Sequence, residues 1–281
     1  MSPAEARDCA TWCNGPMTTL TSNDVVPADR LRQAAVTVAE LFCVVGTLVG
    51  VGVIGTRVAE SAGGALAADA TLIAPAGPAF AIWTPIYLGL AGFTVYQWLP
   101  AQAAEPRHRA IGWLAAASMV LNAAWLLVTQ QDWIWVSVVV MAGLVVALGL
   151  LVLRLQEHPS YGHGETVLVD GTFGLYLGWV TVAACANVTA ALVASGVDPG
   201  GLPAELAAVA VLAVAAGVGV LLARRLGGRW AVAGAMAWGL LWIAWGRLAD
   251  EPRSTVVAVA AVVAAVVVLV AAARQQARTG G

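Results

Sequence analysis

Long stretches without Asp, Glu or Arg dominate this sequence. They cover residues 70–104, 110–131, 133–153, 171–197, 206–223, 230–246 and 254–273, and a further apolar run at 33–56 is interrupted only by Glu40. A helix needs about 20 mostly apolar residues to cross a bilayer. A membrane barrel would instead show short alternating segments. The pattern therefore predicts an all-α integral membrane protein with about eight transmembrane helices, which makes the lipid bilayer its main partner.

The charged residues exclude several other classes of protein. Only 11% of the chain is charged, whereas a soluble domain carries roughly 25%. The formal net charge is −2, so a nucleic-acid partner is not expected. All 14 basic residues are arginines, and without a lysine amine the chain has neither a Schiff-base nucleophile nor a P-loop lysine. No cofactor is expected, although a porphyrin remains possible as a ligand.

The arginines also predict the orientation of the helices. With eight spans, the termini and the even-numbered loops lie on one side, and that side holds eleven arginines against three on the other. Positively charged loops remain in the cytoplasm, so both termini are expected to be cytoplasmic in a multi-pass protein of a bacterial cell membrane. Residues 1–32 form a polar tail without the apolar core of a signal peptide. Residues 275–281 form a second short tail.

The cysteines and histidines do not suggest a metal centre. Cys9 and Cys13 lie in the cytoplasmic tail, where a disulfide is not expected. His108, His158 and His163 are assigned to cytoplasmic loops and are expected to be solvated. No metal site is predicted.

Eleven of the twelve tryptophans divide by their expected depth, and Trp12 belongs to the tail. Six lie near helix ends, where an aromatic belt explains them: Trp98, Trp113, Trp133, Trp135, Trp230 and Trp245. Five lie deeper, namely Trp83, Trp125, Trp179, Trp238 and Trp242. Trp238, Trp242 and Trp245 form one stripe at helical spacing, for which helix–helix packing is the simpler explanation and a second ligand site the alternative.

Two asparagines lie at the depth of the deep tryptophans. Counting 1.5 Å per residue from the outer helix ends puts Asn122 and Asn187 roughly 12 Å inside the membrane, close to Trp83 and Trp125. An asparagine in hydrocarbon needs a partner, so both side chains should face the bundle interior. The simpler interpretation is a polar packing contact, and the functional one is a ligand pocket. Residues 55–74 form the longest outer loop and are expected to cover such a pocket as a lid.

Three motifs in this region resemble a known family. Residues 78–87 read PAFAIWTPIY, residues 122–125 read NAAW, and residues 176–187 read YLGWVTVAACAN. In order and helix placement they are similar to the motifs of the tryptophan-rich sensory protein family (TspO, translocator protein). The resemblance covers roughly residues 33–195. The chain departs from the family pattern at Ala81, Leu126 and Leu175.

The resemblance implies a TspO-like bundle of five helices, assigned here to residues 33–197, with a pocket beneath its first loop. Family members bind porphyrins and other apolar molecules, so the chain is expected to be a receptor- or sensor-like protein for a planar apolar ligand. Residues 198–274 would add a three-helix membrane segment. The residues expected to bind the ligand are Trp83, Tyr87, Asn122, Trp125, Tyr176, Trp179 and Asn187.

Two other functions remain open at this stage. A small-solute secondary transporter could use Glu40 and Asp170 as coupling groups, although both carboxylates are more simply explained by arginines at the cytoplasmic interface, namely Arg30, Arg32 or Arg154. A porphyrin-modifying enzyme is the other alternative, but no catalytic residue is assigned. Gly46 and Gly50 permit a close helix contact, either within the bundle or in a homodimer.

Overall fold

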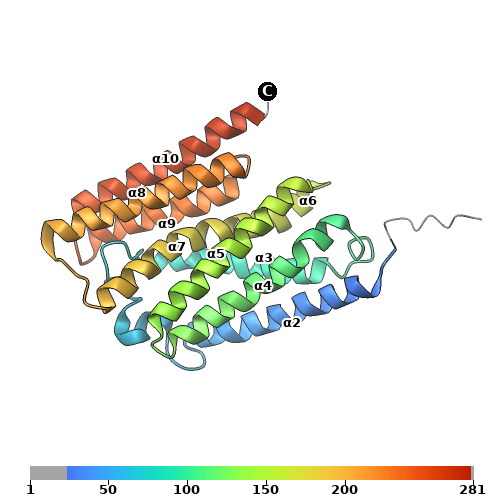
Figure 1. The fold of residues 1–281 in the computed structure, drawn as a ribbon, viewed down its shortest axis with the longest axis horizontal. Helices are drawn as coiled ribbons and strands as arrows, with labels where there is room; N and C mark the ends of the chain where they lie inside the picture. Colours follow the sequence, from blue (N-terminus) through green and yellow to red (C-terminus); the bar gives the residue numbers. More distant parts are fainter. Residues whose placement is uncertain (1–23, 280–281) are drawn as a thin grey trace, which may run out of the picture.

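The computed structural model describes residues 24–279, and this part of the chain is mostly helical (Figure 1). As predicted, eight helical segments within it are long and apolar enough to cross a membrane. They are α2 (Pro27–Gly50), η3 with α3 (Gly77–Ile82 and Trp83–Tyr96), α4 (Pro106–Thr129), α5 (Ile134–Glu157), α6 with η4 and α7 (His163–Glu165, Thr166–Gly171 and Thr172–Ala194), α8 (Gly201–Arg225), α9 (Trp230–Ala249) and α10 (Thr255–Thr279).

Prolines and glycines mark where several helices begin and end. Pro27 and Pro106 open α2 and α4, and Pro78 lies in the first turn of η3. The missing N–H of proline costs nothing at these positions because the first helical N–H groups have no intrahelical partner. Gly227 and Gly228, both with positive φ, form the tight turn between α8 and α9.

The first five spans form one bundle. In it α2 packs against α4, α4 against α5, and α5 against α7, while α3 contacts α2 and α7. Gly46 of α2 lies so close to Ala123 of α4 that an added Cβ would be 2.9 Å from the Ala123 Cα. The close approach predicted for Gly46 and Gly50 is therefore made within the chain, between α2 and α4.

The three remaining spans attach to this bundle through α9. Figure 1 shows α8, α9 and α10 as a separate layer, and α9 is the member of that layer that packs extensively on α7. The contact is close because Gly178 of α7 faces the backbone of Val232, whose carbonyl oxygen would be 2.3 Å from an added Cβ. Small residues let membrane helices approach in this way.

The exposed tryptophans agree with the predicted aromatic belts. Four of the five deeper tryptophans are buried or half-buried, and only Trp238 remains partly exposed. All six tryptophans assigned to the helix ends are exposed on the protein surface: Trp98, Trp113, Trp133, Trp135, Trp230 and Trp245.

Candidate functional site

An aromatic cluster occupies the centre of the first bundle. The ring of Trp83 stacks on Tyr87 with 5.1 Å between centroids. It also meets Tyr176 and Trp179 edge-on, at 5.8 and 6.3 Å. Phe80 packs edge-on against Trp179 at 5.5 Å. The i, i+3 spacing of Tyr176 and Trp179 turns both side chains inward on α7, and both are almost completely buried.

Asn122 lies beside this cluster and has a partner on each of two other helices. Its amide Nδ2 donates to the Tyr87 hydroxyl at 3.1 Å and to the Cys43 Sγ at 3.4 Å. Its carbonyl oxygen Oδ1 is buried and has no partner among the described residues. The inward orientation predicted for Asn122 is therefore confirmed.

Asn187 forms a second polar group, with Trp125 and Ser137. The indole Nε1 of Trp125 donates to Asn187 Oδ1 at 3.3 Å, and Asn187 Nδ2 donates to Ser137 Oγ at 3.0 Å. Ser137 was not among the predicted site residues, although a serine within an otherwise apolar span is a signal that could have indicated it. These contacts join α4, α5 and α7.

A small cavity lies between these two groups and the outer loop. Its volume is about 60 Å³. Three of the seven predicted site residues line it, namely Trp125, Trp179 and Asn187. The other four lie outside its lining. Trp83, Tyr87 and Tyr176 belong to the aromatic cluster, and Asn122 is hydrogen-bonded to Tyr87. The Trp179 Nε1 is buried without a partner among the described residues. The cavity thus combines flat apolar faces with hydrogen-bonding groups.

The predicted lid covers this cavity. The segment between α2 and η3 folds into two short 3-10 turns, η1 (Val58–Glu60) and η2 (Ala62–Gly64). Its side chains form one wall of the cavity, which is made of Val58, Ala65, Leu66, Ala67, Thr71, Ala74 and Pro75.

The layer of α8, α9 and α10 is hydrogen-bonded to the same segment through α9. The guanidinium of Arg247, near the end of α9, donates to the Thr71 carbonyl at 2.7 Å and to the Ala68 carbonyl at 3.2 Å. The Trp242 carbonyl accepts the Ala76 N–H at 3.2 Å. Trp238 Nε1 donates to the Ala79 carbonyl at 2.9 Å. Arg247 is only 1% exposed. This arginine therefore bonds inside the protein and is not a solvated charge of a connecting loop.

The tryptophan stripe on α9 also lies beside the lid. Trp238 and Trp242 are 5.6 Å apart, and Trp242 and Trp245 are 6.4 Å apart, in both cases edge-on. The predicted stripe is therefore a continuous row of ring contacts, and two of its members bond to the segment that enters η3.

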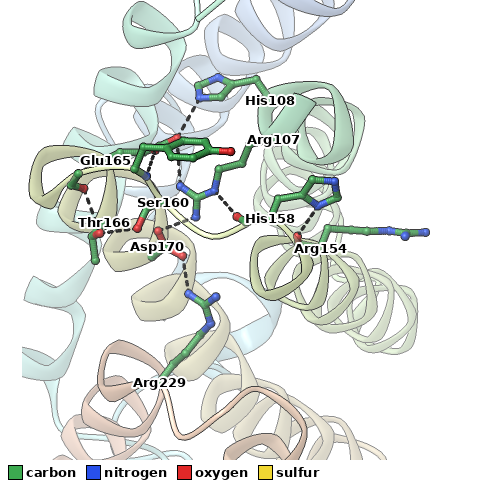
Figure 2. A network of polar contacts seen from close by, with 11 residues as sticks. Arg107, His108, Arg154, His158, Ser160, Glu165, Thr166, Asp170 and Arg229 are labelled. Atoms are coloured by element: carbon green, nitrogen blue, oxygen red, sulfur yellow. Dashed lines mark hydrogen bonds and ion pairs between the residues drawn. The ribbon is translucent and has the colours of Figure 1, made fainter. Parts of the chain in front are cut away.

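A network of charged side chains lies at the opposite end of the bundle (Figure 2). Asp170 accepts from Arg107 of α4 at 2.6 Å and pairs with Arg229 at the start of α9. Arg107 also pairs with Glu165 at 3.1 Å. The expectation that Asp170 pairs with Arg30, Arg32 or Arg154 was wrong, because α4 brings Arg107 directly beside it while Arg154 pairs with Glu157 on its own helix.

His108 and Glu40 also differ from expectation. His108 is buried, since α4 begins at Pro106 and directs this ring onto Phe93, 5.6 Å away. The solvated loop position predicted for it was wrong. Glu40 is only 7% exposed, and its Oε2 has no partner among the described residues. Glu40 Oε2 therefore does not bond to an arginine of the interface among the described residues.

The remaining candidates add no metal-binding cluster. Within residues 24–279 no three His, Cys, Asp or Glu side chains gather to hold an ion. Cys43 is buried, Cys185 is half-buried, and both are free. Cys9 and Cys13 lie outside the described residues.

The chain matches one family model, described as TSPO-like protein, over residues 35–274. The match includes the three motifs noted in the sequence and continues through α8, α9 and α10. Neither curated proteins nor solved structures give a significant match.

Proposed function

The chain belongs to the TSPO-like protein family, which indicates a membrane protein of the sensor or receptor type, and on that premise we propose that it binds a planar apolar ligand, with porphyrin as the first candidate. The site is the cavity beneath the lid. The observation that carries the proposal is the convergence of Trp125, Trp179 and Asn187 on this cavity.

The chemistry of the lining supports a flat ligand with polar edges. Indole faces stack well on an extended π system. Trp179 Nε1 is a buried donor without a partner among the described residues, and such a donor is costly unless a ligand or water accepts from it. Ligand pockets combine apolar walls with a few polar groups of this kind.

The size of the cavity implies that the ligand enters by displacing the lid. Ligand pockets typically measure about 300–1,000 Å³, whereas this cavity measures about 60 Å³. The lid is attached to α9 by hydrogen bonds to the backbone at Ala68, Thr71 and Ala76. We therefore propose that residues 33–197 bind the ligand and that residues 198–274 hold the lid over it.

The transporter alternative is not favoured by the ionic contacts. Asp170 is paired with two arginines, so it is not a free coupling group. Of these two carboxylates, Glu40 keeps one buried oxygen, Oε2, without a partner among the described residues.

A porphyrin titration of the purified full chain tests the proposal, with quenching of tryptophan fluorescence as the readout. Trp179→Ala should weaken binding more than Trp179→Phe does, because phenylalanine keeps an aromatic face. Trp133→Phe is the control, since Trp133 is exposed and does not line the cavity. Binding that survives Trp179→Ala unchanged in a folded protein would refute the site.

A further inference from the structure

A second and larger hollow lies at the end of the bundle opposite the lid. It is a groove of about 900 Å³ between α3, the η4–α7 segment and the turn that leads into α9. Its apolar walls include Pro85, Leu88, Leu168 and Leu175, of which Pro85 and Leu88 are exposed on the protein surface. Thr172 and Gly89 lie side by side on α7 and α3, so that a Cβ on Gly89 would be 2.1 Å from the Thr172 hydroxyl.

The groove becomes polar toward the end of the helices. Asp170, Arg229, Thr166, Gln156 and Gln276 line this part. Figure 2 shows Arg229 extending from the start of α9 to Asp170. That contact uses one nitrogen, Nη1, while the Arg229 side chain remains 21% exposed. The Arg229 guanidinium therefore has further N–H donors available for a ligand at the polar end of the groove.

The charge around this end favours an anion. Residues 206–249 and 252–279 contain no Asp or Glu. Gln276 bonds to the carbonyls of Gly227 and Gly228 at 3.2 Å, which places the end of α10 beside the α8–α9 turn. Three more arginines belong to the last turns of α8 and α10, namely Arg224, Arg225 and Arg278, and Arg274 lies one turn earlier on α10. Asp170, the groove's only acidic lining residue among those described, is already shared between Arg107 and Arg229.

We propose that this groove binds an anionic phospholipid. Its phosphate would accept hydrogen bonds from Arg229, and one acyl chain would lie along η4 and the first turn of α7, from Thr166 to Leu175, a distance of about 13 Å. Clusters of arginine beside membrane helices attract anionic headgroups in this way. Trp230, which also lines the groove and is exposed, would lie at the level of the headgroup.

The proposal is independent of the ligand site beneath the lid. The lid cavity contacts α7 between Trp179 and Ala190, whereas the groove contacts the same span between Thr166 and Leu175. A lipid in the groove would contact both the five-helix bundle and α9, next to the ion pair of Asp170 and Arg229.

The test is native mass spectrometry of the full chain with phosphatidylglycerol or phosphatidylcholine of equal acyl length. The wild type should retain phosphatidylglycerol preferentially. Arg229→Gln should reduce that preference about tenfold, since a charge-assisted hydrogen bond is lost. Val167→Trp should reduce the retention of phosphatidylglycerol by filling the groove while leaving every ion pair intact, because Val167 is 74% exposed and lines the groove.

Arg154→Gln is the control, since it removes an exposed arginine at the same end that does not line the groove. Equal retention of the two lipids by the wild type would overturn the proposal. So would a preference that survives both groove variants. Displacement of the lipid by inorganic phosphate, with no effect of Val167→Trp, would indicate a simple phosphate site and would also overturn it.

Discussion

Arg247 of α9 donates a hydrogen bond of 2.7 Å to the carbonyl oxygen of Thr71, which lies 176 positions earlier in the chain. Thr71 belongs to the segment that covers the cavity. A buried guanidinium that bonds to two backbone carbonyls holds this segment. The last three spans therefore contact the cover of the candidate ligand site, and α9 also approaches its lining, since a Cβ on Gly239 would be 3.5 Å from the Trp179 ring.

Replacing Arg247 should release the lid. Arg247→Met keeps much of the side-chain volume but removes both hydrogen bonds, each worth about 1.5–3 kcal/mol for a charged donor. We expect the rate of porphyrin dissociation to rise about tenfold or more in stopped-flow measurements. Arg253→Gln, an exposed arginine at the same end of the protein, should leave the rate unchanged. A folded Arg247→Met protein with the wild-type rate would show that the contact does not restrain the lid.

The polar group around Asn187 should affect both binding and stability. Asn187→Leu keeps the volume but removes the partner of Trp125 and Ser137, so porphyrin affinity should fall by about 1–2 kcal/mol. Ser137 lies outside the cavity lining. Ser137→Ala should therefore cost about 1 kcal/mol of stability with little change in porphyrin affinity. Titration and thermal unfolding of both variants separate the two effects, and equal affinity losses would contradict this assignment.

The ion pairs at the other end should be important for stability. Asp170→Asn removes the carboxylate that pairs with Arg229. It also leaves Arg107, which is 1% exposed, with Glu165 as its remaining carboxylate partner. Breaking a buried pair in this way should lower the free energy of unfolding by about 3 kcal/mol. Glu157→Gln breaks an exposed pair and should cost less than about 1 kcal/mol. Unfolding in detergent measures both, and similar costs would mean that burial does not strengthen the Asp170 network.

The orientation in the membrane can be tested with reporter fusions. The eleven-to-three division of arginines predicts that reporters after residue 61, after residue 106 and at the C-terminus lie outside, inside and inside, respectively. An external C-terminus would be incompatible with eight spans and a cytoplasmic N-terminus.

The sequence was sufficient for the features that depend on local pattern. The lengths of the apolar runs predicted eight spans, and the eight apolar helices agree with them. The helical spacing of Tyr176, Trp179 and Asn187 puts their side chains on one face of α7, and all three are buried. The inward position of Asn122 followed from the cost of an unpaired amide in hydrocarbon. Each of these inferences uses only neighbouring residues and the bilayer as solvent.

The tertiary structure decided which distant groups meet. The pairing of Asp170 with Arg107 and Arg229, the burial of His108, the contact of Ser137 with Asn187 and the attachment of the lid to Arg247 all join different helices. In a low-dielectric interior a hydrogen bond or ion pair is strong, so these buried groups pair with the partners that the packing places beside them. That packing depends on where small residues allow close approach, as Gly178 does for Val232 of α9. A linear pattern does not state which helix will lie there, so the sequence defined the spans and their inward faces, whereas only the packed bundle defined the partners.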